Sequence, residues 1–378
     1  MQDSGDSTVA AKVGLKWNQY PDDVLPAWVA EMDFGVASPI ARALEAAIER
    51  GDTGYPYPAL EKDTAEAARD FWSQALGWNV SPERVFAAPD VIEGLRRAIV
   101  HLTRPGSPVI LHTPVYYPFF SLVERAGRDL IEVPSSRDDS GLHRLDIDGI
   151  DRALEDGAGS IVLCNPWNPT GRCFDADEIG RLVEVVRTHD GRILADEVHA
   201  PLTYSGVIHT VAATLDPEIV VTVTSASKAW NIPGLKCAQV VLTADADAER
   251  WSAYYTPEKV GVSTFGLIAN AAAYADARGW LAGVRERLAV NRSLLTDLIA
   301  THLPRVGYVP PQGTYLAWLD FTPHGLADPA GYFLEHARVA LTDGGPFGAS
   351  GAGHARLNFA TTPQILTEIT ERMGAALP

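Results

Sequence analysis

Apolar residues follow two alternating patterns between residues 38 and 280. Segments in which apolar positions recur every three or four residues predict amphipathic helices, and short β-branched apolar runs predict strands covered on both faces. The predicted helices cover residues 38–51, 59–76, 91–104, 146–156 and 175–189. The predicted strands cover residues 109–112, 130–133, 160–165, 192–196, 219–224 and 239–242. This alternation is typical of the α/β class, with a mostly parallel central sheet and helices on both faces.

The pattern changes near residue 280. After a long helical stretch over 264–301, the predicted elements are strands at 306–309, 315–319 and 355–360 and helices at 328–339 and 363–376. These shorter elements predict a smaller α+β lobe. Because 378 residues exceed what one compact core usually holds, two lobes are expected on length as well. We expect a large domain over residues 46–280 and a small domain made of residues 1–45 and 281–378.

Composition and charge narrow the classes of function. The chain has 31 Lys and Arg against 48 Asp and Glu, and the net charge of −17 repels nucleic-acid backbones and anionic membrane surfaces. No apolar run is long enough to predict a membrane span, and the polar, acidic start does not resemble a secretory signal. The three cysteines show neither metal-ligand spacing nor a paired framework. We expect a cytoplasmic protein with no nucleic-acid or membrane partner and no metal site.

Polar side chains stand where three neighbouring strands are predicted to end. Asn168 and Lys228 each follow a predicted strand, and Asp196 ends one. In open α/β sheets, ligands bind beyond the carboxyl ends of the strands, so these three side chains are expected to meet. Singly, each has an ordinary explanation as a turn asparagine, a capping aspartate or a surface lysine. Together they predict a site.

These residue types suit one kind of chemistry. A lysine whose charge is disfavoured by burial becomes a nucleophilic amine that can form a Schiff base. A buried carboxylate such as that of Asp196 can pair with a protonated pyridine nitrogen, which lets the ring accept electrons from a carbanion. Asn168 could donate to a phenolate oxygen, and the small hydroxyl residues beside Lys228 could bind a phosphate.

The motifs resemble those of the fold-type I pyridoxal-phosphate enzymes of the class I/II aminotransferase superfamily. The matching segments are Asn-Pro-Trp-Asn-Pro-Thr-Gly at 165–171, Asp-Glu at 196–197, Ser-Ala-Ser-Lys at 225–228 and the arginine segment at 351–360. Within that superfamily, residues 25–34, 196–199 and 227–231 are similar to the MalY/PatB group of C–S lyases. Glu31 departs from this group, which usually has Asp there.

The resemblance implies pyridoxal 5'-phosphate as the cofactor. Lys228 would be the amine that bonds the cofactor and shuttles the proton, Asp196 the partner of the pyridine nitrogen, and Asn168 the donor to the 3' oxygen. Tyr116 would stack on the ring.

The phosphate of the cofactor is expected at the start of the helix that follows Asp90, because helix N-termini bind anions. The residues implied in phosphate binding are Val91, Ile92, Ser225, Ser227, Lys236 and Tyr55. Asp90 would repel the phosphate unless it caps the helix and faces away. Tyr55 would come from the neighbouring subunit, which implies a homodimer with shared active sites.

The substrate implied by the resemblance is an L-amino acid. Arg356 would clamp its α-carboxylate with a bidentate fork, and the backbone N–H of Ala30 and the side chain of Asn168 would assist. The expected reaction is α,β-elimination of cystathionine or a similar sulfur amino acid to pyruvate, ammonia and a thiol. The core residues equally suit an aminotransferase, and a regulatory protein that retains the cofactor site is a third alternative. The leaving group and the role of His199 stay open.

Overall fold

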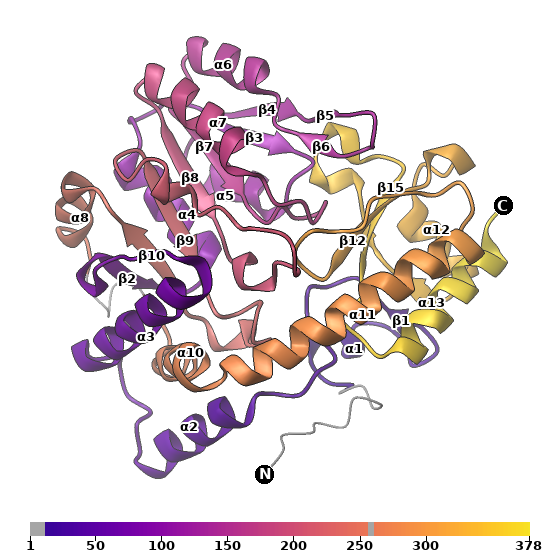
Figure 1. Cartoon of the computed structure of the whole chain (residues 1–378), viewed down its shortest axis with the longest axis horizontal. Coiled ribbons are helices and arrows are strands. Elements are labelled where there is room, and N and C mark those ends of the chain that lie inside the picture. Colours follow the sequence, from indigo (N-terminus) through magenta and orange to yellow (C-terminus); the bar gives the residue numbers. More distant parts are fainter. Residues whose placement is uncertain (1–11, 256–260) are drawn as a thin grey trace.

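A seven-stranded sheet forms the centre of the chain (Figure 1). The computed structural model describes residues 12–255 and 261–378. In spatial order the strands are β2 (Val85–Ala88), β10 (Ala238–Leu242), β9 (Val220–Thr224), β8 (Arg192–Asp196), β7 (Ser160–Cys164), β3 (Val109–Thr113) and β4 (Leu130–Pro134). β10 runs antiparallel to both of its neighbours, and the pairs from β9 to β4 are all parallel. The expected mostly parallel sheet is confirmed.

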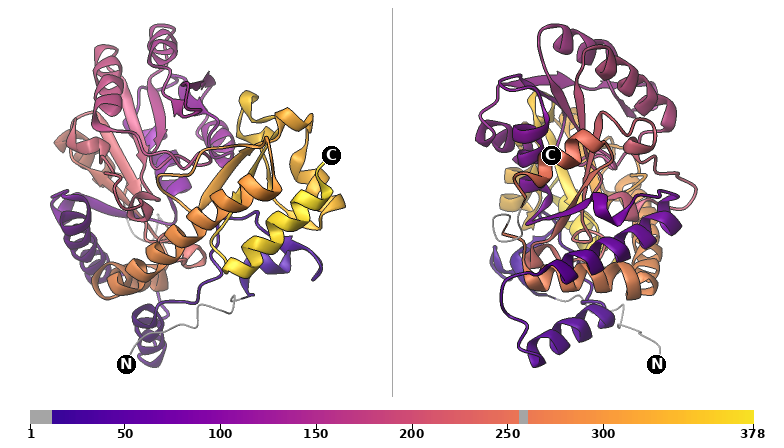
Figure 2. Two further views of the ribbon diagram at one scale, coloured as in Figure 1. Left: turned by 45° about the vertical axis from the view of Figure 1, so that its right-hand side comes forward. Right: turned by 90° about the vertical axis from the view of Figure 1, so that its left-hand side faces the viewer.

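Helices cover this sheet on both sides (Figure 2). The helices of this part of the chain are α2 (Ser38–Glu49), α3 (Pro58–Leu76), α4 (Val91–Leu102), α5 (Pro118–Arg125), α6 (Ile147–Glu155), α7 (Ala176–Thr188), α8 (Asp245–Ser252) and α10 (Thr264–Asp276). Of these, α2 packs on α10. α4 and α5 pack on each other and on strands of the sheet, and α6 and α7 form a second such pair. The doubly covered sheet explains why its strands are continuous apolar runs rather than alternating ones.

A second, smaller sheet lies in the C-terminal part of the chain. Its strands are β11 (Gly307–Tyr308), β12 (Leu316–Asp320), β15 (His354–Asn358) and β14 (Thr342–Asp343), in that spatial order. The helices beside it are α11 (Arg278–His302), α12 (Pro329–His336), α13 (Pro363–Ala376) and the short α1 (Gly14–Asn18). Two two-stranded pairings complete the fold, β1 (Leu25–Pro26) with β13 (Val339–Ala340), and β5 (Ser136–Arg137) with β6 (His143–Arg144). The expected smaller α+β part is therefore present.

Two features of the fold differ from the sequence predictions. The strand β2 and the helices α5 and α8 were not predicted, because each is short and depends on its neighbours. The predicted helix over 264–301 is instead two helices, α10 and α11, which are separated at Ala277. There, the carbonyl of Ala277 accepts a hydrogen bond from the indole Nε1 of Trp230, at 3.0 Å. A contact with a residue far away in sequence accompanies the break.

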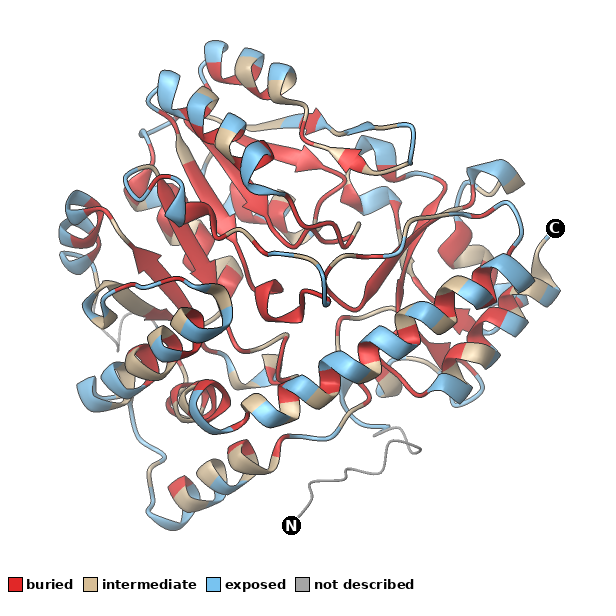
Figure 3. Cartoon of the chain, viewed as in Figure 1, coloured by how far each residue is buried: buried red, intermediate tan, exposed pale blue. Residues whose placement is uncertain are grey.

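The strands of the large sheet form the buried centre of the chain (Figure 3). Every residue of β3, β7, β9 and β10 is buried. Apolar side chains within these strands offer no acid, base or nucleophile. The side chains able to take part in a reaction are therefore the polar ones at the strand ends. Across residues 12–255 and 261–378, none of the helices combines the length and apolar character needed to span a membrane.

Candidate functional site

The site lies at the carboxyl ends of β7, β8 and β9. These strands are adjacent and parallel, with Cys164 opposite Asp196 and Asp196 opposite Val223. Asn168 follows β7 and Lys228 follows β9, so the strand order brings both toward Asp196 on the middle strand. The three residues line one cavity of about 190 Å³. The expected meeting of these side chains is present in the structure.

The amine of Lys228 faces this cavity and is partly buried. Its Nζ donates to the carbonyl oxygen of Ala30 at 3.2 Å. Desolvation, followed by the nearby charge of Arg356, lowers the pKa of Lys228 to about 8, while Glu31 and Asp196 act in the opposite direction. About one tenth of the amine is therefore neutral at pH 7, far more than for an ordinary lysine, and the neutral form is the one that acts as a nucleophile or a base.

The carboxyl group of Asp196 is almost fully buried. Its Oδ1 accepts from the backbone N–H of Val198 at 3.1 Å. Burial raises the pKa of Asp196 to about 7, and the hydrogen bond from Val198 and the charge of Lys228 only partly offset this effect. A buried acid of this kind is poised to pair with a cationic ring nitrogen placed in the cavity.

Asn168 and Arg356 are joined by a hydrogen bond. Nη1 of Arg356 donates to Oδ1 of Asn168 at 3.0 Å, and Nη2 donates to the carbonyl of Trp28 at 3.1 Å. Because its oxygen is taken by the guanidinium, Asn168 keeps its amide N–H₂ as a donor. Burial lowers the pKa of Arg356 from its ordinary value. The small sheet thus brings its arginine to the site through β15, which begins at His354 and ends at Asn358.

Two further ring side chains line the same cavity. Tyr116, between β3 and α5, is partly buried, and burial raises its pKa to about 12. His199, just beyond β8, is buried, and its Nδ1 has no hydrogen-bond partner in the described part of the chain. Burial holds the pKa of His199 well below its ordinary value, so the ring is neutral. An aromatic ring and a neutral imidazole therefore border the cavity.

One end of the cavity is formed by the first residues of α4, Val91 and Ile92, together with Ser227 and Lys236. Lys236 lies two residues before β10, and because β10 runs antiparallel to β9, its start lies at the same edge as the carboxyl end of β9. Backbone donors of a helix N-terminus, a hydroxyl and an ammonium are the groups that a phosphate binds.

Asp90 lies at this end of the cavity as the N-cap of α4. Its Oδ1 accepts from the backbone N–H of Glu93 at 2.8 Å, and its Oδ2 pairs with Nζ of Lys236 at 2.8 Å. The carboxylate therefore caps the helix, as required if a phosphate is to approach α4. It also engages the ammonium group expected to neutralise that phosphate.

Two of the expected phosphate-binding residues do not line the cavity in the described chain. The hydroxyl of Ser225 donates to the carbonyl of Cys237 at 2.7 Å and accepts from the backbone N–H of Ser227 at 2.9 Å. Ser225 thus orders the turn that carries Lys228, and its phosphate contact stays a prediction. Tyr55 is 84% exposed on the connection between α2 and α3. A side chain placed there is available to a second copy of the chain.

The geometry fits pyridoxal phosphate. An amine, a buried acid, an amide donor, an aromatic ring and a helix N-terminus border a single cavity. These are the groups required by an aldehyde, a pyridine nitrogen, a phenolic oxygen, a flat ring and a phosphate, respectively.

Sequence reasoning missed several side chains at this site. Tyr315 donates its hydroxyl to the carbonyl of Ala30 at 2.9 Å, beside the ammonium of Lys228. Asn231 and Asn358 bind the backbone of the segment that contains Ala30. Both asparagines stand in motifs already singled out, three residues after Lys228 and two after Arg356, which was the available signal. Nothing in the local pattern indicates what they bind.

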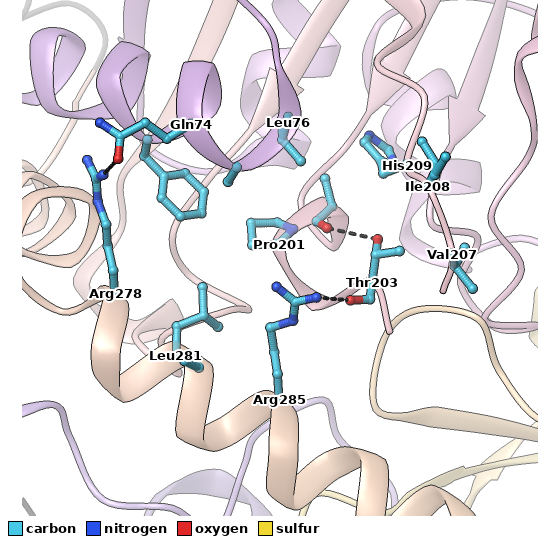
Figure 4. A pocket seen from close by; sticks show the side chains of 14 residues that line it. Gln74, Leu76, Pro201, Thr203, Val207, Ile208, His209, Arg278, Leu281 and Arg285 are labelled. Carbon is cyan, nitrogen blue, oxygen red and sulfur yellow. Dashed lines mark hydrogen bonds between the residues drawn. The ribbon is translucent and has the colours of Figure 1, made fainter. Parts of the chain in front are cut away.

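A larger cavity, of about 570 Å³, lies elsewhere and contains none of the expected site residues (Figure 4). Apolar side chains of α3, α11 and the connection after β8 form most of its wall. Its two arginines are already engaged: Arg278 donates to Oε1 of Gln74 at 2.5 Å, and Arg285 donates to the carbonyl of Thr203 at 2.7 Å. Cavity size therefore does not locate the chemistry of this chain.

The fold and the site define a class of protein. The chain belongs to the family of class I and II aminotransferases, whose model matches residues 10–373. Within that family it is similar to cystathionine beta-lyase of Corynebacterium glutamicum, with 39% identity over 96% of both chains. It is also similar to cystathionine beta-lyase PatB of Bacillus subtilis, with 31% identity over 96% of both chains. The expected resemblance to the MalY/PatB group is thereby confirmed.

A solved structure shares the arrangement of most of the chain. Cystalysin from Treponema denticola, whose crystal structure contains a pyridoxal 5'-phosphate cofactor, superposes with a TM-score of 0.89 at 25% identity. The similarity covers 96% of this chain and 95% of cystalysin. It includes both sheets, so the expected fold type is confirmed for the described residues as a whole.

Proposed function

We propose that this chain is a pyridoxal-phosphate-dependent C–S lyase that acts on cystathionine or a similar sulfur amino acid. The observation that carries the proposal is the meeting of Lys228 and Asp196 in one cavity at the ends of neighbouring strands. The relatives named cystathionine beta-lyase support the choice of reaction. The products would be pyruvate, ammonia and a thiol.

The proposed cofactor contacts follow from the chemistry of the residues around the cavity. Lys228 would bond the aldehyde, Asp196 would pair with the ring nitrogen, Asn168 would donate to the phenolic oxygen, and Tyr116 would stack on the ring. When bound, pyridoxal phosphate supplies an electrophilic aldehyde and a ring that accepts electrons from the substrate carbon. The proposed phosphate contacts are Val91, Ile92, Ser227, Lys236, Ser225 and, from a second copy of the chain, Tyr55.

The residues of the chain would then bind the substrate and move its protons. Arg356 would orient the α-carboxylate, supported by the backbone N–H of Ala30 and by Asn168. The free amine of Lys228 would take the proton from Cα, for which a pKa of about 8 suits it. As the electron pair left on Cα forms a Cα–Cβ double bond, the Cβ–S bond would break, the sulfur would leave with the bonding electron pair, and the ammonium of Lys228 could return a proton to it. Water would then hydrolyse the released aminoacrylate to pyruvate and ammonia.

The test is to incubate the purified, cofactor-loaded protein with cystathionine and no added keto acid. We expect equal amounts of pyruvate and thiol, and their loss by at least about a thousandfold in Lys228→Ala, because the base and the bonding amine are the same group. An absorbance band that disappears on borohydride treatment, with the modification on Lys228, checks cofactor attachment. Amino-group transfer that needs a keto acid, without thiol release, would instead identify the aminotransferase alternative.

We also propose how the chain assembles, where in the cell it is located and how it divides into domains. A homodimer with shared sites is supported by the exposed position of Tyr55, outside the cavity of its own chain. A cytoplasmic location is supported by three free, buried cysteines. The proposed large domain covers residues 46–280, and the proposed small domain is made of residues 1–45 and 281–378. The four-stranded sheet, which lies wholly within the second set of residues, supports this division.

A further inference from the structure

The backbone of residues 27–34, here called the bridging segment, is held by side chains from both sheets. The donors from the small-sheet region are Arg356, Asn358, Tyr315 and Thr342, and those that follow β9 are Lys228 and Asn231. Because a buried carbonyl without a partner is costly, such contacts determine where the segment can lie. The bridging segment is therefore positioned from two sides.

Asn358 binds the two carbonyls that flank Ala30. Its Nδ2 donates to the carbonyl of Val29 at 2.7 Å and to that of Glu31 at 2.6 Å. Its Oδ1 accepts from the backbone N–H of Ala360 at 2.8 Å, which leaves the amide no freedom to rotate. Asn358 is fully buried. One side chain thus sets the backbone on both sides of Ala30.

Asn231 binds the next part of the segment. Its Oδ1 accepts from the backbone N–H of Met32 at 2.9 Å, and its Nδ2 donates to the carbonyl of Met32 at 2.9 Å. The residue has a φ of 56°, in the left-handed region that asparagine tolerates better than most residues. Only two residues separate it from Lys228. The turn that carries the amine therefore also holds the segment that the amine contacts.

The carbonyl of Ala30 is the group that these contacts position. It accepts from Nζ of Lys228 at 3.2 Å and from the hydroxyl of Tyr315 at 2.9 Å. Resting on the proposed function, we infer that Asn231 and Asn358 are positioning residues that keep this carbonyl where it accepts the Lys228 ammonium whenever the amine is not bonded to the cofactor. A stable resting place allows the amine to leave and return along one path.

The charges that face Lys228 come from several elements. Arg356 on β15 disfavours the ammonium, whereas Glu31 of the bridging segment and Asp196 on β8 favour it. The ring of His199 is neutral. Glu31 would move with the segment when Asn358 is changed, because Asn358 binds its carbonyl, and its favourable charge would then be farther from the amine. Loss of the Ala30 contact should therefore destabilise the ammonium and lower the pKa of the amine.

The test compares Asn358→Ala with Asn291→Ala. Asn291 is a matched control, because its Nδ2 also donates to two buried carbonyls, of Phe359 and Thr361, but not to the bridging segment. The rate of Lys228 acetylation by acetic anhydride is followed by mass spectrometry against pH, in the full chain before cofactor is added. We expect a midpoint near 8 for the parent and Asn291→Ala. For Asn358→Ala we expect a midpoint lower by about one pH unit, the effect of losing one charge-assisted hydrogen bond.

Urea unfolding of both variants gives the structural comparison, since both should lose a similar amount of stability. An unchanged midpoint in Asn358→Ala, or an equal shift in Asn291→Ala, would overturn the inference. If Asn358→Ala does not fold, Asn231→Gly replaces it, because glycine accepts the left-handed backbone at this position. The two proposals can fail separately. If the labelling midpoints are as expected but the protein releases no thiol from cystathionine, the C–S lyase proposal is wrong, whereas the positioning of the amine is supported.

Discussion

At the scale of single residues, burial gives the site its chemistry. The same desolvation lowers the pKa of Lys228 to about 8 and raises that of Asp196 to about 7. In water the two groups would differ in pKa by more than six units, and here they titrate close together. Both shifts favour neutral forms in the unloaded protein. A bound cationic ring would reverse the preference of Asp196, because its carboxylate would then have a partner.

Asp196 should therefore make the unloaded protein less stable as the pH rises. Its pKa in the folded protein is about 7, above its ordinary value of 3.8. Its contribution to the free energy of unfolding is therefore fully present below pH 3.8 and is lost as the pH rises through 7. Urea unfolding at pH 5 and pH 7.5 checks this against the isosteric Asp196→Asn. Between pH 5 and pH 7.5, we expect the free energy of unfolding to fall by at least about 1 kcal/mol more in the parent than in the variant. Equal pH dependence in the two proteins would contradict the assignment.

At the scale of elements, the helix α4 contacts both the cavity and the large sheet. Asp90 caps its first turn, and Val91 and Ile92 border the cavity. Four residues beyond Asp90, Gly94 lies against the sheet: a Cβ there would meet Cγ1 of Val223 at 2.9 Å and Cγ2 of Val240 at 3.1 Å. These valines belong to β9 and β10, the strands next to Lys228 and Lys236. The close approach of α4 therefore requires glycine at this position.

A matched pair of substitutions tests this packing. Gly94→Ala should destabilise the protein by about 1–3 kcal/mol, because the added methyl group pushes α4 off the two valines. Gly180→Ala on α7 has open space around its Cβ and should stabilise by about 0.5–1 kcal/mol through helix propensity. Thermal unfolding of both variants gives the comparison. A stabilising Gly94→Ala would show that α4 does not need this contact.

At the scale of the whole molecule, the site is shared between parts that are distant in sequence. Asn168, Asp196 and Lys228 come from the large sheet, Arg356 comes from the small sheet, and the bridging segment runs between them. Tyr55 is exposed and belongs to none of these contacts within its own chain. A second copy of the chain is the partner that would use it.

Complementation between two inactive chains tests the shared site. Tyr55→Ala and Lys228→Ala chains are purified separately, then co-refolded in equal amounts. Random pairing makes half of the dimers mixed, and each mixed dimer has one site with both residues intact, so about a quarter of the parent activity should return. Size-exclusion chromatography checks that dimers form. If the mixture only reaches the average of the two separate variants, each site is complete within one chain.

The sequence by itself determined the fold class and the residues at the strand ends. Strand and helix patterns depend on local periodicity, and Lys228, Asp196, Asn168 and Arg356 stand in short motifs, so both can be identified without tertiary contacts. Only the tertiary structure decided what those residues contact. It brings Asn358 to carbonyls more than 300 residues away in the chain, assigns the Ser225 hydroxyl to a backbone carbonyl and pairs Lys236 with Asp90. Such contacts depend on how the two sheets pack, which no local pattern records.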